Sequence, residues 1–118
     1  MENDNRFEMQ KMDAYQVALQ LARRVHEAKL RDPELADQAT RAVKSAFLGL
    51  CEGLPNEQVG LRRKYFTQAN NSLHETVGAV DLSLAIGAVN AEDAEAIQAL
   101  ALRLKRMLRA LIMGGAGR

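Results

Sequence analysis

Apolar residues recur every three or four positions in four segments of the chain, which is the period of an amphipathic α-helix. Polar and small side chains fill most of the positions between them. No segment shows the strict alternation of a half-buried strand, so the pattern predicts four helices. In chain order, the faces are Tyr15, Ala18, Leu19, Ala22, Val25 and Lys29, widened by Leu21; Leu35, Ala39, Ala42, Val43, Ala46 and Leu50, with Phe47 at the edge; Phe66, Ala69, Leu73, Val77, Val80 and Leu84; and Ala94, Ile97, Ala101, Leu104, Leu108 and Leu111.

Residues between these segments predict where the helices start and end. Asp13 is a candidate N-cap of the first helix, and Pro33 suits the first turn of the second. The second helix runs into "LCEGLP", where Gly53 is suited to a left-handed residue just past a helix end. Gly87 ends the third helix. Asn90 is a good N-cap for the fourth, whose first turn carries the acids Glu92, Asp93 and Glu95.

Short connections force consecutive helices to run antiparallel. We therefore predict an all-α fold, an antiparallel up-down-up-down four-helix bundle over residues 12–112. Residues 1–11 are expected to be a flexible N-terminal segment, and residues 113–118 a disordered tail.

Composition agrees with one helical domain of 118 residues and 13.0 kDa. The hydrophobic fraction is 47%, mostly Ala and Leu, and there are two prolines and no Trp. The single cysteine cannot form an internal disulfide, which fits a reducing cytoplasm. No signal-peptide core and no apolar run long enough to span a bilayer are visible. We expect a cytoplasmic protein with no membrane contact.

Catalytic and metal chemistry find little support. Cys51 lies near a predicted helix C-terminus beside Glu52, and both disfavour a thiolate, so we interpret it as structural. The two histidines, His26 and His74, lie on different helices, and neither has the Glu three residues before it that a bundle metal site uses. No Gly-rich phosphate loop opens a helix. We expect no catalytic residue, metal, cofactor or small-molecule substrate.

The placement of charge is more informative than the net charge of +1. No acid lies between Gln58 and His74 or between Ala96 and Arg118. In an up-down bundle the start of the third helix and the end of the fourth lie at the same end. The bases gathered there, which we call the basic pole, are Arg62, Arg63, Lys64, Arg103, Lys105, Arg106 and Arg109. They are either ordinary solvated charges or contacts to RNA or DNA phosphates.

Apolar residues beyond the core faces also need a partner. The third helix carries Leu61, Tyr65, Ala79, Leu82 and Ile86 about one residue round from its core face, and the fourth adds Leu100, Leu102 and Met107. These residues either broaden the core or form a surface for self-association. The second interpretation predicts a homo-oligomer.

The chain resembles a family of bacterial four-helix-bundle proteins first noticed as reading frames within intervening sequences of 23S ribosomal RNA genes. The same superfamily includes the accessory variability determinant (Avd) proteins of diversity-generating retroelements. The resemblance spans Lys11 to Ile112 and rests on "MDAYQVALQLA", "ADQATRAVKSAFLGLCEG", "YFTQANNSLHET" and "AIGAVNAEDAEAI", in that order. Where this chain has Gly49, Cys51 and Asn71, the family often has Asn, Ala and Gly, respectively. Its signature positions here are Gln38, Arg41, Ser45, Glu52, Gly53, Ser72 and Glu75.

The resemblance implies a ring-like homopentamer without enzymatic activity. For the retroelement branch it implies binding of a reverse transcriptase and its template RNA. It also implies that Glu52 pairs with a base such as Arg41 or an Arg of a neighbouring chain. The leading hypothesis is a non-catalytic oligomeric accessory protein that binds nucleic acid, a reverse transcriptase, or both. The alternatives are a structural protein–protein interaction bundle without nucleic-acid contact and an enzyme that uses Cys51 or a histidine.

Overall fold

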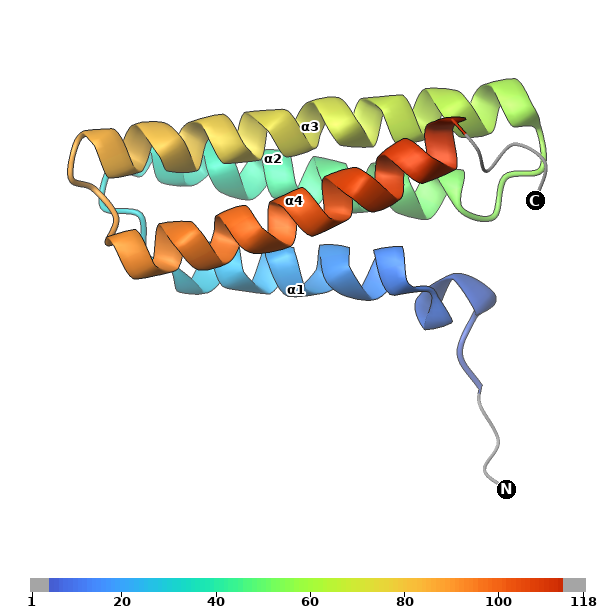
Figure 1. Ribbon diagram of the computed structural model, residues 1–118, viewed down its shortest axis with the longest axis horizontal. Coiled ribbons are helices and arrows are strands. Elements are labelled where there is room, and N and C mark those ends of the chain that lie inside the picture. The colour runs from blue at the N-terminus through green and yellow to red at the C-terminus, as the bar shows by residue number, and fades with distance from the viewer. Residues whose placement is uncertain (1–4, 114–118) are drawn as a thin grey trace.

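The computed structural model describes residues 5–113, which contain four α-helices and no strand. The helices are α1 (Asp13–Glu27), α2 (Pro33–Gly53), α3 (Val59–Ala85) and α4 (Ala91–Met113). Consecutive helices run antiparallel, and α4 returns between α3 and α1, so the four pack side by side in a ring (Figure 1). The predicted up-down-up-down four-helix bundle is confirmed at the level of one chain.

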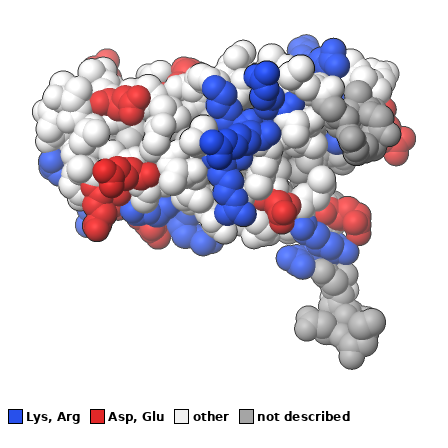
Figure 2. Space-filling model, in the orientation of Figure 1, with Lys and Arg blue, Asp and Glu red and all other residues white. Residues whose placement is uncertain are grey.

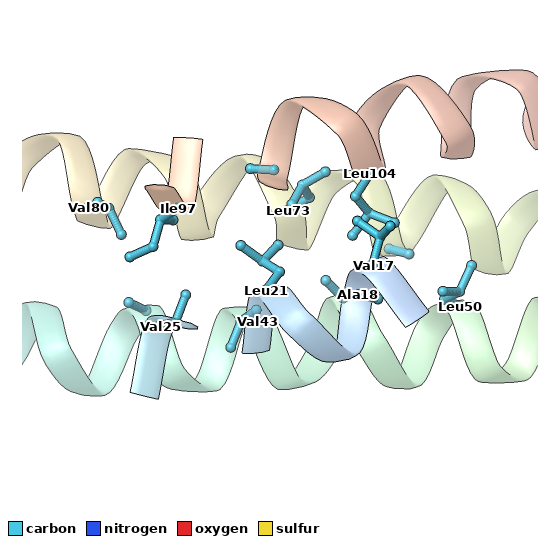
Figure 3. Packing of buried hydrophobic residues seen from close by; sticks show 14 of the residues in the cluster. Val17, Ala18, Leu21, Val25, Val43, Leu50, Leu73, Val80, Ile97 and Leu104 are labelled. Carbon is cyan, nitrogen blue, oxygen red and sulfur yellow. The ribbon is translucent and has the colours of Figure 1, made fainter. Parts of the chain in front are cut away.

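Aliphatic side chains from all four helices meet along the axis of the bundle (Figure 3). Leu21, Leu73 and Leu104 come from three different helices, and each is no more than 2% exposed. Many of the other buried positions are alanines, which allow the helices to approach closely. The predicted faces of α2 and α4 supply most of their expected core residues, which are Ala39, Ala42, Val43, Ala46 and Leu50 on α2, and Ala94, Ile97, Ala101, Leu104 and Leu108 on α4.

Helix ends set by local chemistry lie close to where the sequence predicts them. The Asp32 carboxylate accepts a hydrogen bond from the Leu35 amide at 2.9 Å, with Pro33 in the first turn of α2. The Asn90 side-chain oxygen accepts from the amide of Asp93 at 2.7 Å at the start of α4. Gly87 has φ of +74° just after α3, as expected of a helix-ending glycine.

Two predictions at the ends of α1 are wrong. Asp13 is the first helical residue rather than the N-cap. Met12 precedes it at the cap position, and its side chain makes no capping hydrogen bond. Lys29 does not lie on the helical face, because α1 ends at Glu27 and Lys29 is exposed with φ of +54°. The chain turns there toward α2 before another helical turn can form.

The predicted role of Gly53 as a helix-ending glycine is also wrong. Gly53 is the last residue of α2 and has no positive φ, so it is not the left-handed cap that the sequence suggested. A Cβ built at Gly53 would lie 2.5 Å from Cε1 and 2.7 Å from Cδ1 of Phe66, whose side chain is fully buried. The position requires glycine because the ring of Phe66 fills the space that a methyl group would need.

The buried face of α3 is rotated toward α2 relative to the prediction. Leu84 is exposed and Val77 is only half-buried, whereas three small polar residues are buried. The reason is the close α2–α3 contact: a Cβ at Gly49 would lie 3.2 Å from Cβ of Ala69. The three hydroxyl groups tolerate this burial because each has a hydrogen-bond acceptor. Thr76 donates to Ser72 O at 2.9 Å and Ser83 to Ala79 O at 2.8 Å within α3, whereas Ser72 donates across to Ser45 Oγ of α2 at 3.0 Å.

The predicted bundle limits, residues 12 and 112, can be compared with the structure at both ends of the chain. Within the segment expected to be flexible, residues Glu8–Lys11 form a 3₁₀ helix, η1, and Met9 packs against the core. Residues 1–4 lie outside the described residues, as does the predicted tail apart from Met113, which ends α4. Within residues 5–113, no helix combines the length and apolar character that crossing a membrane requires.

Candidate nucleic-acid interface

Four basic side chains lie on the solvent side of α4. The helical period turns Leu104 and Leu108 into the core and leaves the neighbouring bases exposed. Figure 2 shows basic side chains as a band across the face of the bundle over the middle of α4. None of these four bases has a salt-bridge partner among the described residues. The four, which we call the basic band, are Arg103, Lys105, Arg106 and Arg109.

The bases of α3 lie apart from this band. The start of α3 and the end of α4 are at the same end of the bundle, as predicted (Figure 1). Arg63 and Lys64 are exposed in the first turns of α3, where Figure 2 shows a separate basic group. The seven residues of the basic pole therefore divide into a band over the middle of α4 and a smaller group on α3.

Arg62 has a different environment from the other six bases. Its guanidinium donates to the carbonyl oxygens of Leu54 at 2.8 Å and Asn56 at 3.4 Å, and lies 5.0 Å from the centre of the Phe66 ring. Its side chain is half-buried. Arg62 thus holds the α2–α3 connection, and because its guanidinium is already bonded we leave it out of the surface considered for phosphate contacts.

A pocket of about 180 Å³ opens between α3 and α4 beside the basic band. Its apolar residues are Leu73, Val77, Ala101 and Leu102. Its polar residues are His74, Gln98 and Lys105, and no acidic residue lines it. Lys105 therefore belongs both to the basic band and to the rim of this pocket.

The cysteine and histidines are not brought together. Burial of the Cys51 thiol and, to a smaller extent, the charge of Glu52 raise its pKa above the ordinary value, the direction expected from the sequence. His26 and His74 each place Nδ1 against a carbonyl of their own helix, at 3.0 Å from Ala22 O and 2.8 Å from Asn70 O. Within residues 5–113, no three His, Cys, Asp or Glu side chains are grouped closely enough to hold a metal ion.

Comparison with known families finds a match over most of the chain. The model of the family described as 23S rRNA-intervening sequence protein matches residues 10–110. The chain belongs to this family. The resemblance inferred from the sequence motifs is thereby confirmed. A comparison with curated proteins finds no match to the chain.

Four of the seven signature residues of the 23S rRNA-intervening sequence protein family line an open groove between α2 and α3, and only Gly53 and Ser72 are buried. Gln38 donates to the Glu75 carboxylate at 3.4 Å across a polar groove that Arg41 and Ser45 also line. The expected pairing of Glu52 with Arg41 is wrong within the chain, because the Arg41 guanidinium binds Asp37 at 3.0 Å. The signature thus marks a polar, acid-containing groove rather than the basic band.

Sequence reasoning missed the α3–α4 pocket. Gln98 and Leu102 attract no attention in the sequence because they belong to common surface and apolar types. The helical register places both on the side of α4 that turns toward α3, but only the observed packing puts them opposite His74 and Val77. The signal available in the sequence was the register alone.

Proposed function

We propose that this 23S rRNA-intervening sequence protein binds RNA through the basic band and catalyses no reaction. The observation that carries the proposal is the band itself: four exposed bases on one helix, without salt-bridge partners in the described part of the chain. The helix has no acid after Glu95 to offset them.

The local density of positive charge in the basic band favours phosphate over other ligands. A net charge of +1 gives little long-range attraction, so affinity must come from local contacts. Contacts to four phosphates of a single strand give a slope of log K against log salt of about −3. Affinity should therefore fall about 50-fold between 50 and 200 mM salt. Such binding tolerates many sequences because phosphates carry no sequence information.

The test compares two neutralised variants of equal net charge. In the first, Lys105, Arg106 and Arg109 become Gln; in the second, three exposed bases elsewhere, Arg23, Lys29 and Lys44, become Gln. Fluorescence anisotropy with a labelled uridine oligomer at two salt concentrations gives affinity and slope. We expect the first variant to lose most of the affinity and the salt dependence, and the second to keep both. Equal losses, or no binding by the wild type at low salt, would refute the proposal.

Self-association is the second part of the proposal. Ala79 of the predicted apolar line is buried and Leu61 and Tyr65 are half-buried, but Leu82 and Ile86 are 51% and 56% exposed. We propose that these two side chains are covered in a homo-oligomer. The ring of five subunits implied by the resemblance, and a reverse transcriptase partner, remain predictions. Leu48 on α2, which is 57% exposed, supports the second candidate function, a bundle that contacts proteins alone.

A further inference from the structure

The pocket between α3 and α4 combines an apolar interior with a basic, hydrogen-bonding rim. Leu73 and Ala101 form its buried part, and Leu102, which is 41% exposed, forms part of its wall. The rim carries the Gln98 amide and the Lys105 ammonium. This is the composition of a site for a flat, partly polar ligand attached to a negative charge.

We propose that this pocket receives one unpaired base of a single-stranded RNA whose phosphates lie along the basic band. The inference rests on the proposed function, because the band supplies the phosphate contacts. It adds that the protein distinguishes single strands from duplexes. A base within a duplex is stacked and paired, so it cannot enter a pocket between two helices without being extruded at a cost.

The chemistry of the rim matches the edge of a base. A side-chain amide has both donors and an acceptor, so Gln98 can bond to either kind of base edge. His74 Nδ1 lies 2.8 Å from Asn70 O; in the neutral ring, Nδ1 carries the proton of that bond and Nε2 is left as an acceptor. Lys105 places a positive charge beside the pocket, where the phosphate of the bound nucleotide must lie.

Two other grooves among the described residues lack this combination. The α2–α3 groove contains Glu75, whose carboxylate repels phosphate. The α1–α4 groove contains Arg24, but its guanidinium is paired with Asp93 at 3.1 Å. Both are therefore poorer sites for a nucleotide, and residues away from the α3–α4 pocket can serve as controls.

The experiment separates base contacts from phosphate contacts. A labelled uridine oligomer is compared with an abasic oligomer of the same length, which keeps every phosphate, and with the uridine–adenosine duplex. The double variant Gln98→Ala, Leu102→Ser changes only exposed, uncharged side chains of the pocket. The control, Gln20→Ala with Leu84→Ser, makes the same two changes at exposed positions outside it. Circular dichroism of each variant verifies that it is folded.

We expect the wild type and the control to bind the uridine oligomer about tenfold more tightly than the abasic oligomer, the lower end of what one stacked base contributes. The duplex should bind no better than the abasic oligomer. The pocket variant should lose this preference while keeping its salt slope, because Lys105 and the arginines are intact. If all three ligands bind the wild type equally, or if the pocket variant keeps the preference, the inference fails while the proposed function stands. If no ligand binds at low salt, both fail.

Discussion

Replacing Gly53 with alanine tests the packing of α2 against α3. The added Cβ would lie 2.5 Å from Cε1, 2.7 Å from Cδ1 and 3.2 Å from Cζ of Phe66. Carbon atoms in contact prefer about 3.5–4.0 Å, so the ring must move by about 1 Å. Phe66 is fully buried in the core, so movement of the ring disturbs its neighbours.

Two opposing effects set the size of the change in stability. Overpacking a core typically costs about 1–3 kcal/mol. Alanine recovers about 0.5–1 kcal/mol relative to glycine through the smaller backbone entropy of the unfolded chain. We therefore expect Gly53→Ala to lower the free energy of unfolding by about 1–2 kcal/mol, a fall in Tm of about 4–8 °C for a domain of this size.

The matched control is Gly78→Ala in α3, where a Cβ meets no atom within 4 Å. That change should raise the free energy of unfolding by about 0.5–1 kcal/mol, opposite in sign to the change at Gly53. Urea titrations followed by circular dichroism, at one fixed protein concentration, give both values.

A double-mutant cycle identifies the cause. If the ring of Phe66 is the obstacle, Phe66→Leu should remove much of the cost of Gly53→Ala, giving a coupling energy of about 1 kcal/mol. A cost that persists unchanged beside the smaller leucine side chain would instead indicate a backbone requirement at residue 53. Equal effects of alanine at Gly53 and Gly78 would refute the packing argument.

Three further predictions concern other features of the bundle. Arg62→Ala should lower the free energy of unfolding by about 2 kcal/mol, because it removes charged hydrogen bonds to the α2–α3 connection. Replacing the exposed Arg63 with Ala should change the free energy of unfolding by less than about 0.5 kcal/mol, and chemical denaturation of both variants compares the two values. Cys51 should react with iodoacetamide more slowly than an unfolded cysteine at neutral pH, because the raised pKa of its thiol reduces the fraction of thiolate. The reaction rate should keep rising with pH above the ordinary thiol pKa. A rate equal to or faster than that of the unfolded cysteine would contradict this prediction. Light scattering should give several times 13.0 kDa, and a Leu82→Lys, Ile86→Lys variant should approach one chain mass; a wild-type monomer at micromolar concentration would refute self-association.

Features that depend on neighbouring residues could be predicted from the sequence. The apolar period predicts helices because residues three and four apart share a helix face. Pro33, Asn90 and Gly87 mark helix ends because each acts on backbone groups within a few positions. The short connections then leave few ways to arrange four helices, and the ordered motifs identify the family.

Only the tertiary structure shows which residues of different helices are in contact. Gly53 reads as a helix-ending glycine in isolation, but the ring of Phe66 determines its role. Arg62 is one of three adjacent bases in the sequence, yet it alone of the three reaches the carbonyls of the α2–α3 connection. The α3–α4 pocket likewise depends on the relative rotation of two helices. Helical period fixes a residue's face, but the small residues between α2 and α3 set how closely those helices approach and hence which faces are left for α4.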